Sequence, residues 1–566
     1  MLNKLKTSMK NLSVFSLFLV INISAVFSQN HYGKNGMVAS ASTYASQAGI
    51  EILKAGGNAV DAAIATTFTL AVTWPFAGNI GGGGFMVIHT ENGEVTTFDF
   101  REKAPFASSK DMFLDKNGKL KSGSNHNTAL AIGVPGTVAG LYDAHQKYGL
   151  IPWEKLLERA IQLAESGFPL PKSLANDFFQ FAEAPEKYPE MQSFIKRDGK
   201  VVGFGEDWKQ PALAETLKKI QKEGKKGFYE GEIAEALADY IQSQDGIITK
   251  EDLAQYEAIE RSPIQSTFKG YQLYGMPLPS SGGVTITQMM NMWEQLEETP
   301  IIGSVQYYHI LAEIMRIAFR DRAKYLGDQD FIEIPELEKL LSDEYATELL
   351  EGINFDKAGE STVTEIHSIH EGQETTHLSV MDANGMAVSM TTTLEQGYGV
   401  KMQSPDLGFL LNNEMGDFNA VPGKTTNNGQ IGTPANTIEA GKRMLSSMSP
   451  FIITKNNYPF LVIGSPGGRT IINTVFQTIL GTTVYDYPMA QAIEAPKIHH
   501  QWLPDRIIYE EYKMAPETLK ALEAMGHEIQ MRSFLGRLMG IKYNAETEFM
   551  EGAADSSSPD GGVAAY

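Results

Sequence analysis

A polar segment at residues 353–374 separates two kinds of hydrophobic pattern in this chain. Before it, three stretches alternate polar and apolar positions with helical spacing: residues 136–165, 211–243 and 303–328. After it come five runs typical of strands: residues 376–382, 386–394, 409–412, 450–454 and 459–464. The sequence therefore predicts mainly helices in the first two thirds, a loop, and then strands from the start of the last third.

Glycines interrupt the helical part at informative places. Residues Ala39 to Leu70 are rich in Ala, Ile and Leu, and Gly56-Gly57 predicts a helix stop with Asn58 as the N-cap of the next helix. The four glycines at 81–84 precede a strand, but no Gly-Lys-Ser/Thr follows them. We therefore expect close backbone packing there rather than a phosphate site. Residues 277–296 predict a glycine-rich turn leading into another helix.

The N-terminus has the features of a signal peptide. Lys4, Lys6 and Lys10 precede an apolar stretch from Leu12 to Phe27, which is short for a membrane span. Small residues then predict removal of residues 1–28 and a mature start near Gln29, hence a periplasmic or secreted protein. The alternative is a retained N-terminal anchor helix.

Composition narrows the chemistry. The chain has no cysteine, which excludes disulfides, thiolate metal sites and a cysteine nucleophile. Its formal net charge is −21, and no basic block follows the N-terminal lysines, so nucleic acid is not an expected partner. No other run of about 20 apolar residues predicts a membrane span.

A hairpin after the polar segment brings two threonines together. Asn384-Gly385 is a turn signal. If the loop has three residues, Asp382 opposes Met386, and counting back places Thr375 opposite Thr393. Opposed residues share a face about 5 Å apart, so one hydroxyl can hydrogen-bond the other. A two-residue loop would shift this register and separate them.

Thr375 has an ordinary and a chemical interpretation. Threonine favours strands, so its place at a strand start needs no further reason. Alternatively, a cut after Glu374 would free the α-amine of Thr375, whose pKa of about 7.7–8 suits a mild base for its own hydroxyl. A flexible segment tolerates such a cut.

Several motifs in fixed order support the chemical interpretation. They are "FDFREKAP" (98–105), "TTHLSVMDANGMAVSMTTTLE" (375–395), "LLNNEMGDF" (410–418), "LSSMSP" (445–450) and "GSPGG" (464–468). Each is weak alone, but the ordered set closely resembles the γ-glutamyltransferase (glutathione hydrolase) family of N-terminal-nucleophile hydrolases. The resemblance covers residues from about 33 to 566.

The resemblance implies an α+β fold, a four-layer αββα sandwich. It implies self-cleavage between Glu374 and Thr375 into a large subunit, 29–374, and a small subunit, 375–566, which remain together. The implied substrates are γ-glutamyl amides such as glutathione, with water, amino acids or peptides as acceptors. No metal or organic cofactor is expected.

The resemblance also implies roles for individual residues. Thr375 is the nucleophile, Thr393 orients its hydroxyl, and the N–H groups of Gly467 and Gly468 form an oxyanion hole. Six side chains would bind the donor: Arg101, Glu395, Glu414, Asp417, Ser446 and Ser447. The Arg101 guanidinium suits a bidentate contact with the α-carboxylate, aided by the two serines, and Asp417 suits the α-ammonium.

Other interpretations of these residues remain. Arg101 alone would suit a surface ion pair, and His499-His500 suggests a metal site, although we expect a structural role because no carboxylate-rich ligand pattern accompanies the pair. Gly416 and Met444 depart from the residues common at their positions in the family, and Glu395 and Glu414 make this pocket acidic. Two alternative functions are a related amidase or acylase of different acyl specificity, and a non-catalytic, uncleaved binding protein.

Overall fold

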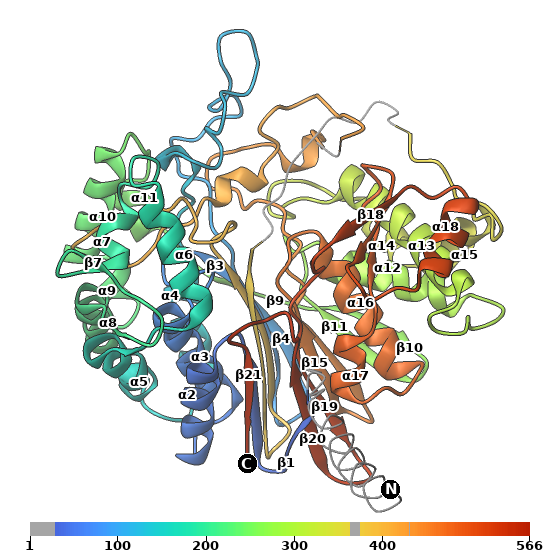
Figure 1. Ribbon diagram of the computed structural model, residues 1–566, viewed down its shortest axis with the longest axis horizontal. Helices are drawn as coiled ribbons and strands as arrows, with labels where there is room; N and C mark the ends of the chain where they lie inside the picture. The colour runs from blue at the N-terminus through green and yellow to red at the C-terminus, as the bar shows by residue number, and fades with distance from the viewer. Residues whose placement is uncertain (1–28, 363–373, 429–430) are drawn as a thin grey trace, which may run out of the picture.

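The computed structural model describes residues 29–362, 374–428 and 431–566. Two seven-stranded antiparallel sheets lie face to face, with helices covering the outer side of each (Figure 1). This arrangement confirms the expected α+β, four-layer αββα fold. The predicted signal peptide, residues 1–28, lies outside the described residues. Within those residues, no helix is both long enough and apolar enough to cross a membrane.

The first sheet carries the candidate nucleophile. Its strands, in spatial order, are β21 (Gly562–Ala565), β2 (Gly36–Ser40), β12 (Thr376–Asp382), β13 (Ala387–Thr393), β3 (Gly83–His89), β4 (Val95–Phe100) and β9 (Ile259–Arg261). The second sheet has the order β1 (His31–Gly33), β20 (Phe549–Ala554), β19 (Met539–Asn544), β15 (Tyr458–Gly464), β14 (Phe451–Lys455), β11 (Tyr271–Gly275) and β10 (Ile264–Phe268).

Helices of the first half of the chain lie on the side of the first sheet (Figure 1). They are α2 (Thr43–Lys54), α3 (Ala59–Thr73), α4 (Thr137–Tyr148), α5 (Trp153–Ser166), α6 (Lys172–Glu183), α7 (Met191–Ile195), α8 (Pro211–Glu223), α9 (Lys226–Tyr229), α10 (Gly231–Ser243) and α11 (Lys250–Ala254). The other side has α12 (Gly282–Glu294), α13 (Val305–Tyr325), α14 (Leu337–Leu340), α15 (Asp343–Glu351), α16 (Thr470–Thr483), α17 (Met489–Glu494) and α18 (Pro516–Ala524).

Short elements complete the structure. The 3₁₀ helices are η1 (Ala129–Ala131), η2 (Glu414–Asp417) and η3 (Pro434–Asn436). A small sheet joins β16 (Ile498–His499), β17 (Ile507–Glu510) and β18 (Ile529–Arg532), and two strand pairs join β5 (Phe168–Pro169) with β8 (Asp207–Trp208) and β6 (Lys196–Arg197) with β7 (Lys200–Val201).

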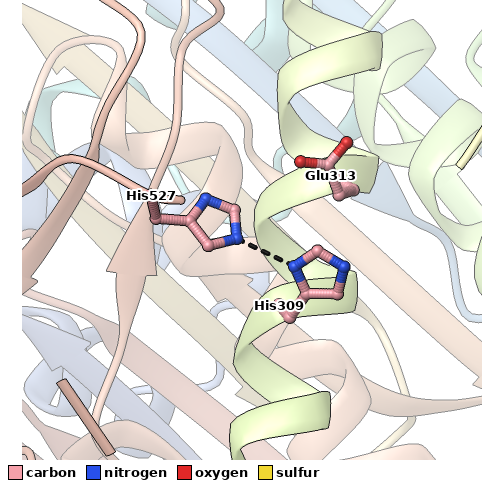
Figure 2. A group of neighbouring side chains, drawn as sticks. All are labelled: His309, Glu313 and His527. Atoms are coloured by element: carbon pink, nitrogen blue, oxygen red, sulfur yellow. Dashed lines mark hydrogen bonds between the residues drawn. The ribbon is translucent and has the colours of Figure 1, made fainter. Parts of the chain in front are cut away.

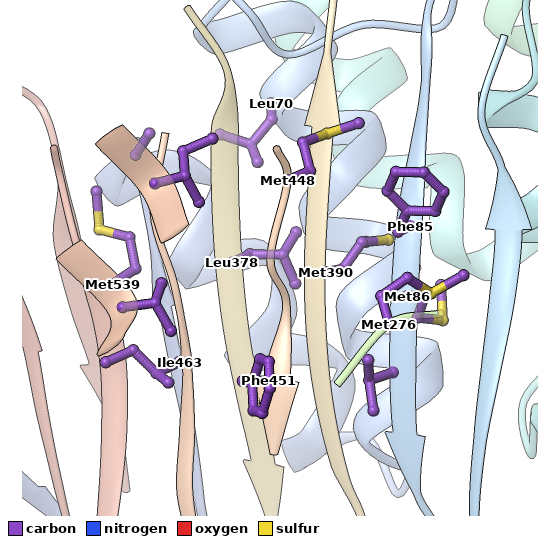
Figure 3. Close-up of a cluster of buried hydrophobic side chains, with 14 of the residues drawn as sticks. Leu70, Phe85, Met86, Met276, Leu378, Met390, Met448, Phe451, Ile463 and Met539 are labelled. Atoms are coloured by element: carbon purple, nitrogen blue, oxygen red, sulfur yellow. The ribbon is translucent and has the colours of Figure 1, made fainter. Parts of the chain in front are cut away.

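Large apolar side chains fill the space around and between the two sheets (Figure 3). Leu378 and Met390 come from the first sheet, and Phe451, Ile463 and Met539 come from the second; each is at most 2% exposed. Burial of this apolar area, at about 25 cal/mol per Å², is the main term that holds the sheets together. The nucleophile strand is therefore anchored in the core.

The predicted helices are confirmed, with one error at the first of them. Asn58 caps α3 through a full capping box with Asp61, as expected. The helix expected from Ala39 begins only at Thr43, because residues 36–40 form β2. Every residue of β2 is buried, so this strand lacks the polar–apolar alternation that would distinguish it from a helix.

The strand prediction was incomplete in the early part of the chain. Seven strands of the two large sheets, β1–β4 and β9–β11, precede the polar segment. The expected strand at 409–412 is wrong, since only Leu410 forms an isolated bridge, with Gln403. These strands pair with segments that are far apart in sequence, so a local sequence pattern does not reveal that they belong to the sheets.

The glycines at 81–84 pack against backbone, as predicted. A Cβ at Gly82 would lie 2.1 Å from the Thr393 carbonyl oxygen, and one at Gly84 would lie 2.3 Å from that of Thr391. The Gly82 N–H donates to Asn79 Oδ1, and Asn79 Nδ2 donates to the same Thr393 carbonyl at 2.9 Å. Because these glycines have no side chains, their backbone can approach the carbonyl groups of β13 closely and hold the end of that strand in place.

Candidate active site

The hairpin of β12 and β13 has the register predicted from the sequence. Thr376 pairs with Thr392, which places Thr375 against Thr393 one position further on. The loop closes with the Asp382 N–H donating to the Met386 carbonyl, and Gly385 has a φ of +80°, a left-handed conformation that favours glycine. The turn chemistry therefore fixes which threonines meet.

Contacts of the Thr393 hydroxyl differ from the expected hydroxyl-to-hydroxyl bond. In the uncleaved chain, Thr393 Oγ1 donates to the carbonyl oxygen of Glu374 at 3.0 Å and accepts from the Glu395 N–H at 2.8 Å. The Glu374 N–H donates in turn to the Glu395 carbonyl at 3.2 Å. The peptide bond before Thr375 is therefore held in place from β13, with its carbonyl polarised by a hydroxyl.

A small cavity brings together almost all of the predicted site residues. Its volume is about 20 Å³, and its lining is Arg101, Thr375, Thr393, Glu395, Glu414, Asp417, Ser446, Ser447, Met448, Gly468 and Ile471. A cavity of this size holds about one water molecule. Gly467 is the neighbour of Gly468, so the structure places all ten residues of the predicted site in one region.

Arg101 is buried among carboxylates rather than exposed. Its Nη1 contacts Glu414 Oε1, its Nη2 lies 2.5 Å from Asp417 Oδ2, and Glu102 Oε2 lies 3.5 Å from Nη1. Burial opposes the charge of Arg101, but these three carboxylates outweigh it and raise the pKa of the guanidinium. A bound donor carboxylate would therefore compete with Glu414 and Asp417 for Arg101.

The two serines also line the cavity, and other segments of the chain hold them in place. Ser446 accepts from Ser281 through its carbonyl oxygen at 2.7 Å, and its N–H donates to the Pro279 carbonyl at 2.9 Å. Ser447 Oγ accepts from Arg322 Nη2 at 2.9 Å. The serine hydroxyls are thus held on a segment that α12 and α13 support.

Gly467 and Gly468 connect β15 to α16. Their φ values are +135° and +58°, in the left-handed range that favours glycine. Helix α16 begins at Thr470, so its first N–H groups point toward this turn. The position suits N–H donors for a developing oxyanion beside Thr375.

His499 and His500 have protein partners. Asn473 Nδ2 lies 2.7 Å from His499 Nδ1, and burial lowers the pKa of His499 to about 3. His500 Nε2 lies 3.2 Å from Asp505 Oδ1. These contacts fit the expected structural role.

Another group of side chains has the composition of a metal site. The ligand atoms of His309, Glu313 and His527 lie within 4.8 Å of one another (Figure 2). His527 Nε2 lies 2.8 Å from His309 Nδ1. Because His309 Nε2 donates to the Asn354 carbonyl, His309 Nδ1 accepts in this contact and His527 Nε2 donates. Glu313 accepts from the Gly359 N–H at 2.9 Å. The two histidines bond to each other, and His309 and Glu313 bond to the segment after α15, so we assign the group to holding that segment.

Comparison with known proteins identifies the family. A family model described as γ-glutamyltranspeptidase matches residues 45–566. The chain belongs to this family. Among its curated relatives, the glutathione hydrolase proenzyme of Escherichia coli (strain K12) is 42% identical over 537 residues, 94% of this chain and 92% of that protein. The Bacillus subtilis (strain 168) glutathione hydrolase proenzyme is 38% identical over 552 residues, 94% and 92% of the two chains.

Solved structures with similar folds include an acylase and a γ-glutamyltranspeptidase. A cephalosporin acylase from Bacillus halodurans superposes with a TM-score of 0.84 at 28% identity, over 95% of this chain and 97% of that one. A Helicobacter pylori γ-glutamyltranspeptidase chain is 41% identical with a TM-score of 0.54, over 56% of this chain and 91% of that one.

Two charged residues of this γ-glutamyltranspeptidase family member were not predicted from the sequence. Glu102 is fully buried beside Arg101, and burial raises its pKa to about 7. Glu102 directly follows Arg101 in "FDFREKAP", which could have indicated a place near the site. The side chains of neighbouring strand residues face opposite ways, however, so the strand pattern argued against it. Arg322 lies on α13 far from every motif, and no local pattern connects it with Ser447.

The raised pKa of Glu102 predicts a change in stability with pH. Because the folded pKa exceeds the usual 4.5, stability is lost as pH rises from about 4.5 through about 7. We expect Glu102→Gln to leave the melting temperature unchanged near pH 4.5 and to raise it above pH 7. The corresponding gain in unfolding free energy is up to about 3 kcal/mol. Thermal melts of both proteins at several pH values test this, and a constant difference would contradict it.

Proposed function

We propose that this chain is the proenzyme of a γ-glutamyltransferase and glutathione hydrolase. It cleaves itself between Glu374 and Thr375, and Thr375 then transfers the γ-glutamyl group of glutathione and related amides to water or to an amino acid or peptide. The observation that carries the proposal is the Thr393 hydroxyl donating to the Glu374 carbonyl, with Thr375 beside it in an acid-lined cavity. The products are subunits 29–374 and 375–566 of one αββα domain.

This geometry supports self-cleavage by the following steps. Thr375 Oγ1 attacks the Glu374 carbonyl carbon, and the Thr393 hydroxyl stabilises the negative charge on its oxygen. The peptide C–N bond breaks, the nitrogen takes a proton, and Glu374 is left as an ester on Thr375. Water hydrolyses the ester, which yields the Glu374 carboxylate and a free Thr375 α-amine.

Turnover uses the same hydroxyl with a new base. The α-amine of Thr375 accepts the hydroxyl proton while Oγ1 attacks the donor's γ-carbonyl carbon. The N–H groups of Gly467 and Gly468 stabilise the oxyanion, and the amine returns its proton to the leaving nitrogen. Water or an acceptor amine then attacks the γ-glutamyl ester and restores the hydroxyl.

The charges of the pocket suit the glutamyl end of the donor. The α-carboxylate of the substrate would replace Glu414 and Asp417 as the partner of the Arg101 guanidinium. The hydroxyls of Ser446 and Ser447 would donate further hydrogen bonds to it. The released carboxylates and Glu395 would then bind the α-ammonium. The cavity of about 20 Å³ must widen for this exchange, and the ion pairs of Arg101 with Glu414 and Asp417 must separate.

The direct experiment incubates the protein with glutathione, with and without a dipeptide acceptor, and measures the free glutamate and the γ-glutamylated dipeptide that form. Release in either form supports the proposal, and none from correctly cleaved protein contradicts it. A butyryl anilide distinguishes the acylase alternative, because an acylase of uncharged acyl groups would prefer it to the γ-glutamyl anilide. An uncleaved binding protein would give a single band on a denaturing gel.

The proposed base predicts a pH profile. Only the deprotonated Thr375 amine accepts a proton, so kcat/KM for hydrolysis should rise with pH through a pKa near the ordinary value of about 7.7–8. A donor with a different amine pKa is the control for titration of the substrate. A limb that lies below pH 5, or that moves with the substrate's amine, would contradict this assignment.

Residues 1–28 are proposed to be an export signal that is removed near Gln29. The basic residues and the apolar stretch before that position support this. Mass spectrometry of the large subunit from its native host should find no residue before about position 29, and a retained Leu12–Phe27 segment would support the anchor alternative.

A further inference from the structure

A histidine outside the predicted site contacts one of the carboxylates that line the cavity. His126, just before η1, places Nδ1 3.4 Å from Oε2 of Glu395. The Glu395 side chain is 1% exposed and that of His126 is 16% exposed. The His126 carbonyl oxygen accepts from Asn413 Nδ2 at 3.0 Å, which fixes its backbone against the loop after β13.

Space for the imidazole depends on Gly416. A Cβ at this position would lie 2.3 Å from both Cε1 and Nδ1 of His126. Gly416 belongs to η2, the same short helix that contributes Glu414 and Asp417 to the cavity. Any side chain at 416 would therefore displace the ring from Glu395.

Glu395 links the nucleophile region to the donor pocket. Its backbone has a φ of +78°, which is strained for a residue with a side chain, and is held by the Thr393 hydroxyl and the Glu374 N–H. One carboxylate oxygen faces His126. The other, Oε1, is buried and has no hydrogen-bond partner among the described residues, so it is available to a donor cation.

We propose that His126 is a positioning residue for donor binding: it orients the Glu395 carboxylate and, through its own charge, sets how strongly the pocket attracts the donor's α-ammonium. This rests on the proposed function. When His126 is protonated, it offsets the charge of Glu395 and weakens the attraction. When it is neutral, the full negative charge of Glu395 acts on the ammonium group.

The charged groups around His126 shift this change to a higher pH than for an ordinary histidine. Burial lowers the pKa of His126, but the hydrogen bond and charge of Glu395, with a contribution from Asp417, outweigh it, while Lys401 acts in the opposite direction. The net result is a pKa above the usual 6.5. KM for a γ-glutamyl donor should therefore fall as pH rises through this pKa.

Steady-state kinetics of two anilide donors test the proposal. We expect wild-type KM for γ-glutamyl anilide to fall severalfold between pH 6 and 9, and His126→Gln to remove this dependence. His126→Ala and Gly416→Ala should each raise KM at pH 8 by about tenfold, the size expected for one charged hydrogen bond, with a smaller effect on kcat. Glutaryl anilide has no α-ammonium and should show none of these KM effects.

A matched control variant and a denaturing gel distinguish a specific effect of His126 from general damage to the fold or to cleavage. His145→Gln removes another mostly buried histidine near a carboxylate, 3.9 Å from Asp61, and should keep the wild-type pH dependence. A denaturing gel selects variants that cleave normally. If the wild type turns over γ-glutamyl anilide but His126→Gln retains its KM profile, or if both donors lose affinity equally, the role of His126 is wrong. An inactive wild type would instead contradict the proposed function.

Discussion

Thr375→Ala is expected to give a single uncleaved chain with no measurable γ-glutamyl transfer or hydrolysis. The substitution removes the hydroxyl that attacks Glu374, so neither the ester nor the free α-amine can form. Loss of a nucleophile lowers catalysis by about 10³-fold or more, and here the base is lost with it. A denaturing gel and a γ-glutamyl anilide assay measure both effects.

Two controls separate chemistry from damage to the strand. Thr375→Ser keeps a hydroxyl and should still cleave, more slowly. Thr376→Val replaces the next residue, whose buried Oγ1 has no hydrogen-bond partner among the described residues, with a side chain of the same shape. It should cleave and turn over normally. Two normal fragments from Thr375→Ala would show that another group performs the cleavage.

Arg101→Lys is expected to raise KM for γ-glutamyl donors by about 10- to 100-fold, the cost of a bidentate charged contact. Lysine keeps the charge but lacks the planar fork that grips a carboxylate. Self-cleavage should persist, because within the described part of the chain Arg101 contacts neither the Glu374 carbonyl nor the Thr393 hydroxyl. KM measured on γ-glutamyl and 4-aminobutyryl anilides tests this.

The 4-aminobutyryl donor lacks the α-carboxylate, so its KM should barely change in Arg101→Lys. Arg261→Lys is the matched control, since Arg261 is also mostly buried and pairs with Asp99 at 3.0 Å outside the cavity. An equal rise for both donors, or for both variants, would mean that Arg101 supports the fold rather than the carboxylate.

Local chemistry made the centre of the site predictable. The Asn384-Gly385 turn fixes a register, and that register alone places Thr375 against Thr393. The order of the motifs then predicts which distant residues join them, and the cavity lining agrees. The capped helix at Asn58 is predictable for the same reason, because a cap is a contact between near neighbours.

Long-range contacts explain what the sequence did not reveal. The Thr393 hydroxyl donates to the carbonyl oxygen of Glu374 in the uncleaved chain, and the strand register alone does not predict this contact. Arg101 reaches Glu414 and Asp417 across more than 300 residues, and the resemblance did not predict these ion pairs within the chain. His126 reaches Glu395 only because Gly416 leaves room, a matter of packing that no motif records.

The N-terminal sequence of the smaller fragment tests the central claim most directly. If Thr375 is both the site of cleavage and the nucleophile, the purified protein contains a fragment that begins Thr375-Thr376-His377-Leu378 and ends at Tyr566. Its intact mass should equal that of residues 375–566. A fragment that begins at any other residue, or an active protein with no cut before Thr375, would contradict the account.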